Sequence, residues 1–156
     1  MRLLVAMDAS PASGEAMRWV ADFAHRLDAE VVAVHAVGLL ERLASPAITS
    51  EAAEEDIAAL AETEWCAPLR QVGVRHETVV VPGDPVEQIL EVAELRRVDA
   101  IVVGTRGALL SEAQRLGSTS HRIIEASTIP VVVVPPPGQV RPTSPTREGD
   151  PTADPV

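Results

Sequence analysis

Glycine and hydroxyl residues cluster at two places in the second half of the chain. The first is the segment Val102-Val103-Gly104-Thr105-Arg106-Gly107, and after nine intervening residues come Gly117 and Ser118. Glycine lets backbone N–H groups approach an anion closely, because it has no Cβ. A helix that opens at Ser118 adds unpaired N–H groups and a positive dipole end. The two stretches together predict a phosphate-binding cradle, to which the hydroxyls of Thr105 and Ser118 can add hydrogen bonds.

An acidic residue near the start of the chain supports this interpretation. Asp8 follows a short apolar run that is typical of a buried strand. Where the first strand of a doubly wound sheet neighbours the fourth, Asp8 and Gly104 flank the crevice in which such sheets bind ligands. The carboxylate can accept from a ribose hydroxyl or an adenine amino group, or hold Mg²⁺. Two simpler interpretations stay open: Gly104 and Gly107 only form a tight turn, and Asp8 only caps the next helix, as Ser10 could.

The elements that would position these residues alternate between strand and helix. Four of five β-rich segments are nearly continuous runs of apolar residues, the pattern of strands covered on both faces in a parallel sheet. The third begins with polar alternation, so we expect it at a sheet edge. Strands that alternate with helices predict βαβ crossovers and one doubly wound α/β domain. The five predicted strands are Leu3 to Met7, Val31 to Val37, Thr78 to Val81, Ala100 to Val103 and Val131 to Val134.

Helix starts are marked by capping residues. Ser10 is expected to cap a helix with Pro11 in its first turn, and Asp84 to cap one that begins at Pro85. Another helix is predicted after Ser50, and a shorter one from Ser118 to about Ala126. The apolar stripes predicted for the first two helices comprise Ala16, Val20, Phe23 and Leu27, and Ile57, Leu60 and Ala61.

Composition excludes several classes of function. A formal net charge of -10 argues against a nucleic-acid partner, because such proteins gather positive charge on one face. The absence of lysine excludes a P-loop of the GxxxxGK[ST] type and a Schiff base. The apolar runs are far too short to span a membrane, and no signal peptide is recognisable, so we expect a cytoplasmic protein.

Single side chains of reactive type are expected to be structural. Cys66 is the one cysteine, which excludes a multi-cysteine metal site, and a small buried apolar role is favoured over a reactive thiol. The four histidines form no i, i+4 pair, so each is expected to be a surface or packed residue rather than a ligand. His35 lies in an apolar run and is expected to be hydrogen-bonded in the interior.

Three motifs together resemble the universal stress protein family, in its ATP-binding branch. They are VAMDAS at residues 5–10, GDP at residues 83–85 and, above all, G-x₂-G-x₉-G-[ST] at Gly104, Gly107, Gly117 and Ser118. The likeness spans residues 2–134, and we take residues 1–135 as one nucleotide-binding domain. Residues 136–156 have no counterpart in it, and their proline-rich composition predicts a disordered tail. The resemblance implies a five-stranded parallel sheet of the adenine nucleotide alpha hydrolase-like type, with strand order 3-2-1-4-5.

The resemblance also implies a site. The backbone around Ala6, Met7 and Asp8, with the end of the second strand near Ala36, would hold adenine and ribose. The implied ligand is ATP or another adenine nucleotide, and Mg²⁺ is a further candidate. The phosphate and ribose site would be lined by Val103, Gly104, Thr105, Gly107, Gly117, Ser118, Thr119 and Ser120.

The last predicted strand favours self-association. Val131–Val134 would leave an apolar open edge, which is an aggregation hazard unless it is paired. A two-fold dimer that pairs this edge with its own copy removes the hazard, and the resemblance implies the same homodimer.

Three hypotheses for function remain. The first is a stress-response regulatory protein that acts as a homodimer and binds ATP or a related adenine nucleotide. The second is a slow ATPase or self-phosphorylating enzyme that uses Asp8, a metal ion and Ser118. The third is a dimeric scaffold that binds no nucleotide. We favour the first, because no general base or nucleophile stands in an obvious catalytic setting.

Overall fold

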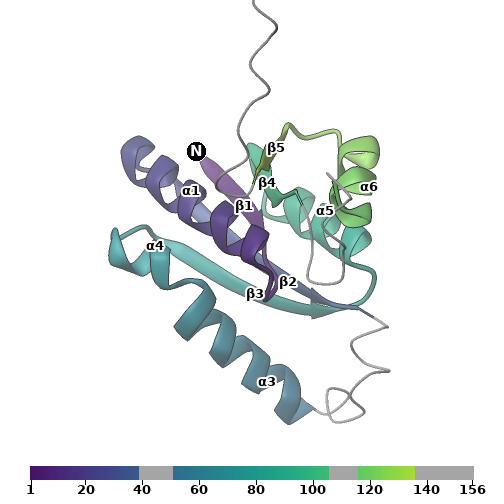
Figure 1. The fold of residues 1–156 in the computed structure, drawn as a ribbon, viewed down its shortest axis with the longest axis horizontal. Coiled ribbons are helices and arrows are strands. Elements are labelled where there is room, and N and C mark those ends of the chain that lie inside the picture. The colour runs from purple at the N-terminus through teal and green to yellow at the C-terminus, as the bar shows by residue number, and fades with distance from the viewer. Residues whose placement is uncertain (39–50, 106–115, 136–156) are drawn as a thin grey trace, which may run out of the picture.

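A five-stranded parallel sheet forms the centre of the protein, with the strand order β3-β2-β1-β4-β5 (Figure 1). The structure is a computed structural model, and it describes residues 1–38, 51–105 and 116–135, with the backbone alone for residues 51–54. The predicted fold class and strand order are confirmed. The strands are β1 (Arg2–Ala6), β2 (Glu30–Val37), β3 (His76–Pro82), β4 (Ala100–Gly104) and β5 (Val131–Val134).

Helices cover both faces of the sheet. α1 and α4 pack on one face, in a core that includes Leu3 and Val5 of β1, whereas α5 and α6 pack on the other face against Leu4. Alternate side chains of one strand therefore enter two different cores, as the period of a strand requires. The helical segments are α1 (Pro11–Leu27), α3 (Glu51–Leu60), the π-helical turn η2 (Ala61–Trp65), α4 (Ala67–Gln71), α5 (Pro85–Leu95) and α6 (Ser118–Ala126).

The predicted capping residues start their helices. The Ser10 hydroxyl accepts a hydrogen bond from the Ser13 N–H at 3.1 Å and caps α1. The Asp84 carboxylate accepts from the N–H groups of Val86 and Glu87, at 3.0 and 3.2 Å, and caps α5. Each cap satisfies N–H groups that have no partner within the helix, so both starts are fixed locally by sequence.

The prediction of buried apolar stripes is wrong for two residues. Leu27 of α1 and Leu60 of α3 are 48% and 39% exposed. In α1 the buried face is centred instead on small residues, among them Ala21 and Ala24, at 1% and 0% exposure. Alanine side chains let α1 approach the sheet closely, so the face of α1 that carries them packs against the sheet. The larger Leu27 lies at the margin of this contact.

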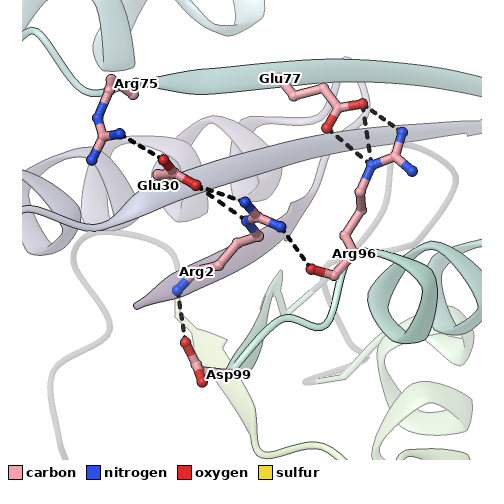
Figure 2. A network of polar contacts seen from close by, with 6 residues as sticks. All are labelled: Arg2, Glu30, Arg75, Glu77, Arg96 and Asp99. Carbon is pink, nitrogen blue, oxygen red and sulfur yellow. Dashed lines mark hydrogen bonds and ion pairs between the residues drawn. The ribbon is translucent and has the colours of Figure 1, made fainter.

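Charged residues gather at the amino ends of the strands, opposite the predicted site (Figure 2). The Arg2 guanidinium binds Glu30 of β2 at 2.8 Å, and the Arg96 guanidinium binds both carboxylate oxygens of Glu77 of β3. These pairs are exposed, so each contributes little on its own. Together they connect β1, β2 and β3 with the turn between α5 and β4, through Arg2, Glu30, Arg75, Glu77, Arg96 and Asp99.

Candidate functional site

The carboxyl ends of β1 and β4 meet at the centre of the sheet. The two strands pair in parallel, with Val5 opposite Val102. The chain leaves β1 toward β2 on one side and leaves β4 toward β5 on the other, so the strand order reverses between them. A sheet of this kind opens a crevice at that point, where ligands bind. The fold therefore brings the residues that follow β1 and β4 to one place.

The two glycine-containing stretches meet at this crevice. The Gly117 N–H donates to the Thr105 carbonyl oxygen at 2.6 Å, and the Ser120 hydroxyl donates to the Gly104 carbonyl oxygen at 2.7 Å. These two bonds tie the start of α6 to the end of β4, although the stretches are separated in sequence. Gly107, the remaining glycine of the motif, lies outside the described residues.

Thr105 carries a polar atom that needs a partner. The residue is 9% exposed, and within the described part of the chain nothing hydrogen-bonds its buried Oγ1. A buried hydroxyl without a partner costs about 1–3 kcal/mol, so such groups are rare in native proteins. An oxygen of a bound phosphate or ribose would supply the missing partner. Thr105 thus fits a ligand at the position that the sequence predicts.

The amino end of α6 lies beside the crevice. Gly117 is its N-cap, in extended backbone, and among the described residues no side chain caps this helix. The first N–H groups of α6 and the positive end of its dipole thus favour an anion here. Ser118 is exposed and Thr119 half-buried, whereas Ser120 is buried and its hydroxyl is used by β4. Of the three predicted hydroxyls on α6, that of Ser120 is therefore already used within the fold.

Gly104 has a packing role that sequence reasoning missed. A Cβ at this position would lie 2.7 Å from the Ala12 carbonyl oxygen and 2.8 Å from its carbon. Both are backbone atoms of the first turn of α1, so Gly104 is required because that helix crosses β4 closely. The neighbouring Val103 is 2% exposed and belongs to the core. The space that a Cβ would occupy at Gly104 thus lies against α1. The lack of a side chain there does not by itself identify an anion site.

The residues after β1 are largely occupied in holding the fold. Met7 donates its N–H to the Val34 carbonyl oxygen at 2.8 Å, and its own carbonyl accepts from His35 Nδ1 at 2.9 Å. The predicted interior hydrogen bond of His35 is confirmed. Asp8 accepts from the Ser10 N–H at 2.8 Å, and its own N–H donates to Ser13 Oγ at 2.9 Å. Asp8 thus shapes the turn into α1, while Ser10 caps the helix.

Small residues line the same end of the first two strands. Ala6 is half-buried at the end of β1, and Ala36 is 8% exposed near the end of β2. The parallel register places Ala6 opposite Val34, two residues before Ala36. The two predicted adenine contacts therefore lie on neighbouring strands, at the carboxyl end of the sheet and close to Asp8.

The GDP motif has a structural explanation. Gly83 has φ +136°, a conformation that side chains with a Cβ rarely adopt, and Asp84 and Pro85 then start α5. Sequence reasoning missed the partner of Asp84, which is Arg122 of α6, at 3.0 and 3.2 Å from the two carboxylate oxygens. This hydrogen-bonded cation is the main cause that holds the pKa of Asp84 below its usual range. The pair ties α5 to α6 beside the crevice.

Comparison with known proteins agrees with this geometry. The sequence profile of the Universal stress protein family matches residues 1–135. Universal stress protein MJ0531 of Methanocaldococcus jannaschii is 33% identical over 143 residues, which cover 87% of this chain and 82% of that protein. In the part of the chain that the structure describes, no helix is long and apolar enough to cross a membrane.

Solved structures share the fold. The structure of protein MJ0577, also from Methanocaldococcus jannaschii, superposes with a TM-score of 0.72 at 26% identity, over 86% of this chain and 94% of that one. A universal stress protein in complex with cAMP superposes with a TM-score of 0.66 at 23% identity, over 86% of this chain and 95% of that one. The architecture is thus that of proteins of which at least one has been solved with an adenine nucleotide.

Proposed function

Because this chain belongs to the universal stress protein family, we propose that it is a stress-response regulatory protein that binds ATP or a related adenine nucleotide and acts as a homodimer. The observation that carries the nucleotide proposal is the buried hydroxyl of Thr105, which has no partner within the described residues and is held beside Gly117 at the amino end of α6. The cAMP complex of a protein with the same fold supports the choice of an adenine nucleotide. We take residues 1–135 as the nucleotide-binding domain.

Phosphate would be held where the strand end and the helix start meet. The Thr105 hydroxyl donates to a phosphate oxygen, and the first N–H groups of α6 and the Ser118 hydroxyl add further donors. The chain needs this local arrangement, because its overall charge of -10 repels an anion. Gly104, Gly107, Thr119 and Ser120 complete the predicted lining of this subsite.

Ribose and adenine would lie toward β1 and β2. The Asp8 carboxylate accepts from a ribose hydroxyl or an adenine amino group, or holds Mg²⁺ that accompanies the phosphates. The backbone at Ala6 and Met7 and the surface near Ala36 border the base. Because both main-chain polar groups of Met7 already bond to residues of β2, polar recognition on this side rests mainly on the Asp8 carboxylate.

A variant at Thr105 separates ligand binding from folding. Thr105→Val keeps the shape of the side chain but removes the hydroxyl. If this hydroxyl serves a nucleotide, isothermal titration with ATP and Mg²⁺ should show about tenfold weaker binding, which corresponds to about 1.4 kcal/mol. The free energy of unfolding without nucleotide should stay equal or rise, because a buried unpaired polar group has been removed.

The exposed Thr128→Val is the matched control and should change neither quantity. Unchanged ATP affinity in Thr105→Val, together with a loss of stability, would show that the hydroxyl has a partner within the protein. Absence of any binding heat or thermal shift with ATP in the wild type would count against the whole nucleotide proposal. Turnover of labelled ATP above the buffer rate would favour the slow ATPase instead.

The proposed homodimer rests on β5. This strand consists of four valines, lies at the edge of the sheet and, within the described residues, pairs with β4 alone. Val131, Val132 and Val133 are only half-buried in the single chain. Pairing two such edges would cover these side chains and satisfy the outer backbone groups.

Light scattering tests the dimer. The wild type should have twice the mass of one chain, and Val133→Lys, which places a charge at the edge, should have the mass of one chain. Leu95→Lys is the control, because Leu95 is 70% exposed at the end of α5, away from β5. A wild type with the mass of a single chain, or a folded Val133→Lys variant that still dimerises, would contradict an interface through β5.

A further inference from the structure

Three potential metal ligands of different type lie together beside the edge strand β3. Glu62 belongs to the π-helical turn η2, Cys66 follows this turn, and His76 begins β3. One carboxylate oxygen, the thiol sulfur and one imidazole nitrogen all lie within 4.8 Å of one another. The side chains of His76 and Glu62 are 11% and 45% exposed, and Cys66 is fully buried. The cluster is therefore partly exposed through Glu62, while its sulfur is buried.

Each ring nitrogen of His76 lies within hydrogen-bond distance of one oxygen atom. Its Nδ1 lies 3.1 Å from the Val74 carbonyl oxygen, which can only accept, so Nδ1 carries a proton. In that tautomer of the neutral ring, Nε2 carries a lone pair and can only accept. It nevertheless lies 3.1 Å from a Glu62 carboxylate oxygen, which is also an acceptor. A cation bound by both atoms would remove this conflict between two acceptors. An Nδ1–H bound to a backbone carbonyl, with Nε2 directed at the metal, is common in metal sites.

Glu62 is held in its charged form. The Thr78 hydroxyl donates to its second carboxylate oxygen, and this bond is the main cause that lowers the pKa of Glu62. The first oxygen is the one that faces His76. The carboxylate is thus oriented by β3 and keeps one oxygen directed into the cluster.

Cys66 has only weak partners. Its sulfur lies 3.6 Å from Thr78 Oγ1 and 4.0 Å from Met7 Sδ, and burial raises the pKa of the thiol. The Cys66 N–H donates to the Ala61 carbonyl oxygen at 2.9 Å, the long hydrogen bond that defines the π-turn. Glu62 and Cys66 are four residues apart, so they share one side of this turn. Such turns are rare and occur frequently at functional sites.

We propose that Glu62, Cys66 and His76 bind one divalent cation of the zinc type, with a fourth position open to solvent. One oxygen, one sulfur and one nitrogen suit zinc, whereas a thiolate disfavours magnesium and calcium. Donor atoms around tetrahedral zinc lie roughly 3.3–3.8 Å apart, given metal–ligand bonds of about 2.0–2.3 Å. The His76–Glu62 distance is already close to that range, and Glu62 is exposed enough to turn toward the sulfur.

Binding has a defined proton balance. The metal bonds to the Cys66 sulfur as a thiolate, so the thiol proton is released to solvent. At least one proton should therefore leave per metal ion bound, with no change of oxidation state.

The bound cation would restrict the motion of the elements beside β3. It would connect η2 to β3, and the contact between Cys66 and Met7 continues this connection to the end of β1. Trp65, next to Cys66, packs edge-on against His35 with ring centroids 5.1 Å apart. None of the three proposed ligands is among the residues predicted to bind the nucleotide.

Cobalt titration of the full-length protein tests the site. Co²⁺ should bind one per chain, give a thiolate-to-cobalt charge-transfer band and the d–d bands of tetrahedral cobalt, and be displaced by Zn²⁺. Cys66→Ser should lose the charge-transfer band, and Cys66→Ser and His76→Gln should each bind Zn²⁺ at least tenfold more weakly in competition with a chromophoric chelator. His121→Gln is the matched control, because the exposed His121–Glu125 pair has the same groups at 3.2 Å but no described sulfur beside it. It should bind like the wild type.

Two measurements on the wild type keep the test independent of how the variants fold. Zinc should release at least one proton per chain in weakly buffered solution, and histidine NMR should show Nε2 of a single ring shifted on binding. Cobalt spectra without a thiolate band, equal affinity in Cys66→Ser, or proton release near zero would overturn the proposal. The cluster would then be a hydrogen-bonded histidine–glutamate pair beside a buried thiol.

Discussion

Gly104→Ala tests whether the crossing of α1 over β4 is set by a missing side chain. The added Cβ would lie 2.7 Å from the Ala12 carbonyl oxygen, 2.8 Å from the Ala12 carbon and 3.1 Å from the Ser13 nitrogen. Favourable contacts of this kind have separations of about 3.5 Å or more, so the closest overlap is about 0.8 Å. All three atoms are backbone, and the turn before them is fixed by the Ser10 cap. The helix therefore has little freedom to withdraw.

The expected cost of Gly104→Ala is about 2–3 kcal/mol, the upper part of the range for overpacked cores. Gly14→Ala is the matched control on the same helix, because its Cβ would meet only the Arg18 side chain at 3.8 Å. That change should stabilise by about 0.5–1 kcal/mol, since alanine is the better helix residue. Urea unfolding followed by circular dichroism measures both, with unchanged slopes. Equal stability of Gly104→Ala and the wild type would refute the packing argument.

Two ion pairs give the remaining predictions. Asp84→Asn keeps a cap for α5 but loses the pair with Arg122, so urea unfolding should show a cost below about 1 kcal/mol, against about 1–2 kcal/mol for Asp84→Ala. Because the pKa of Asp84 is lowered in the folded state, its charged form stabilises the protein above the ordinary pKa of 3.8 and this contribution is lost as the pH falls through the lowered value. The free energy of unfolding of Asp84→Asn should not show this loss at low pH. If the stability of the wild type and of the variant fell in parallel as the pH is lowered, the prediction would be contradicted. Glu77→Gln removes the charge that pairs with Arg96 and should lower the free energy of unfolding by about 0.5 kcal/mol at low salt. An equal loss at high salt would show that charge is not the cause.

Local signals in the sequence were sufficient for much of the fold. Ser10 and Asp84 were predicted as helix caps because their side chains act on N–H groups only two or three residues away. The apolar runs predicted strands buried on both faces, and the polar start of β3 predicted an edge. The strand order came from the resemblance to a family rather than from these patterns.

Features that depend on distant contacts were missed. Gly104 was interpreted through anion binding, but its close neighbour is Ala12, which a sequence pattern cannot place beside it. The partnership of Asp84 with Arg122 arises only when α6 packs next to α5.

The Glu62–Cys66–His76 cluster was missed for a related reason. The histidines were judged by their spacing to one another, whereas the relevant signal is a glutamate four residues before the cysteine, with His76 on the next strand. The pairing of that strand with β2 then fixes where His76 lies.

The central claim is that the ends of β4 and the start of α6 hold the phosphates of an adenine nucleotide. A crystal structure of the protein grown with ATP and Mg²⁺ tests it most directly. We expect density for a nucleotide in the crevice between β1 and β4, with a phosphate oxygen within hydrogen-bond distance of Thr105 Oγ1 and the first N–H groups of α6. Density for the nucleotide elsewhere, or a crevice filled by the protein's own side chains, would contradict it.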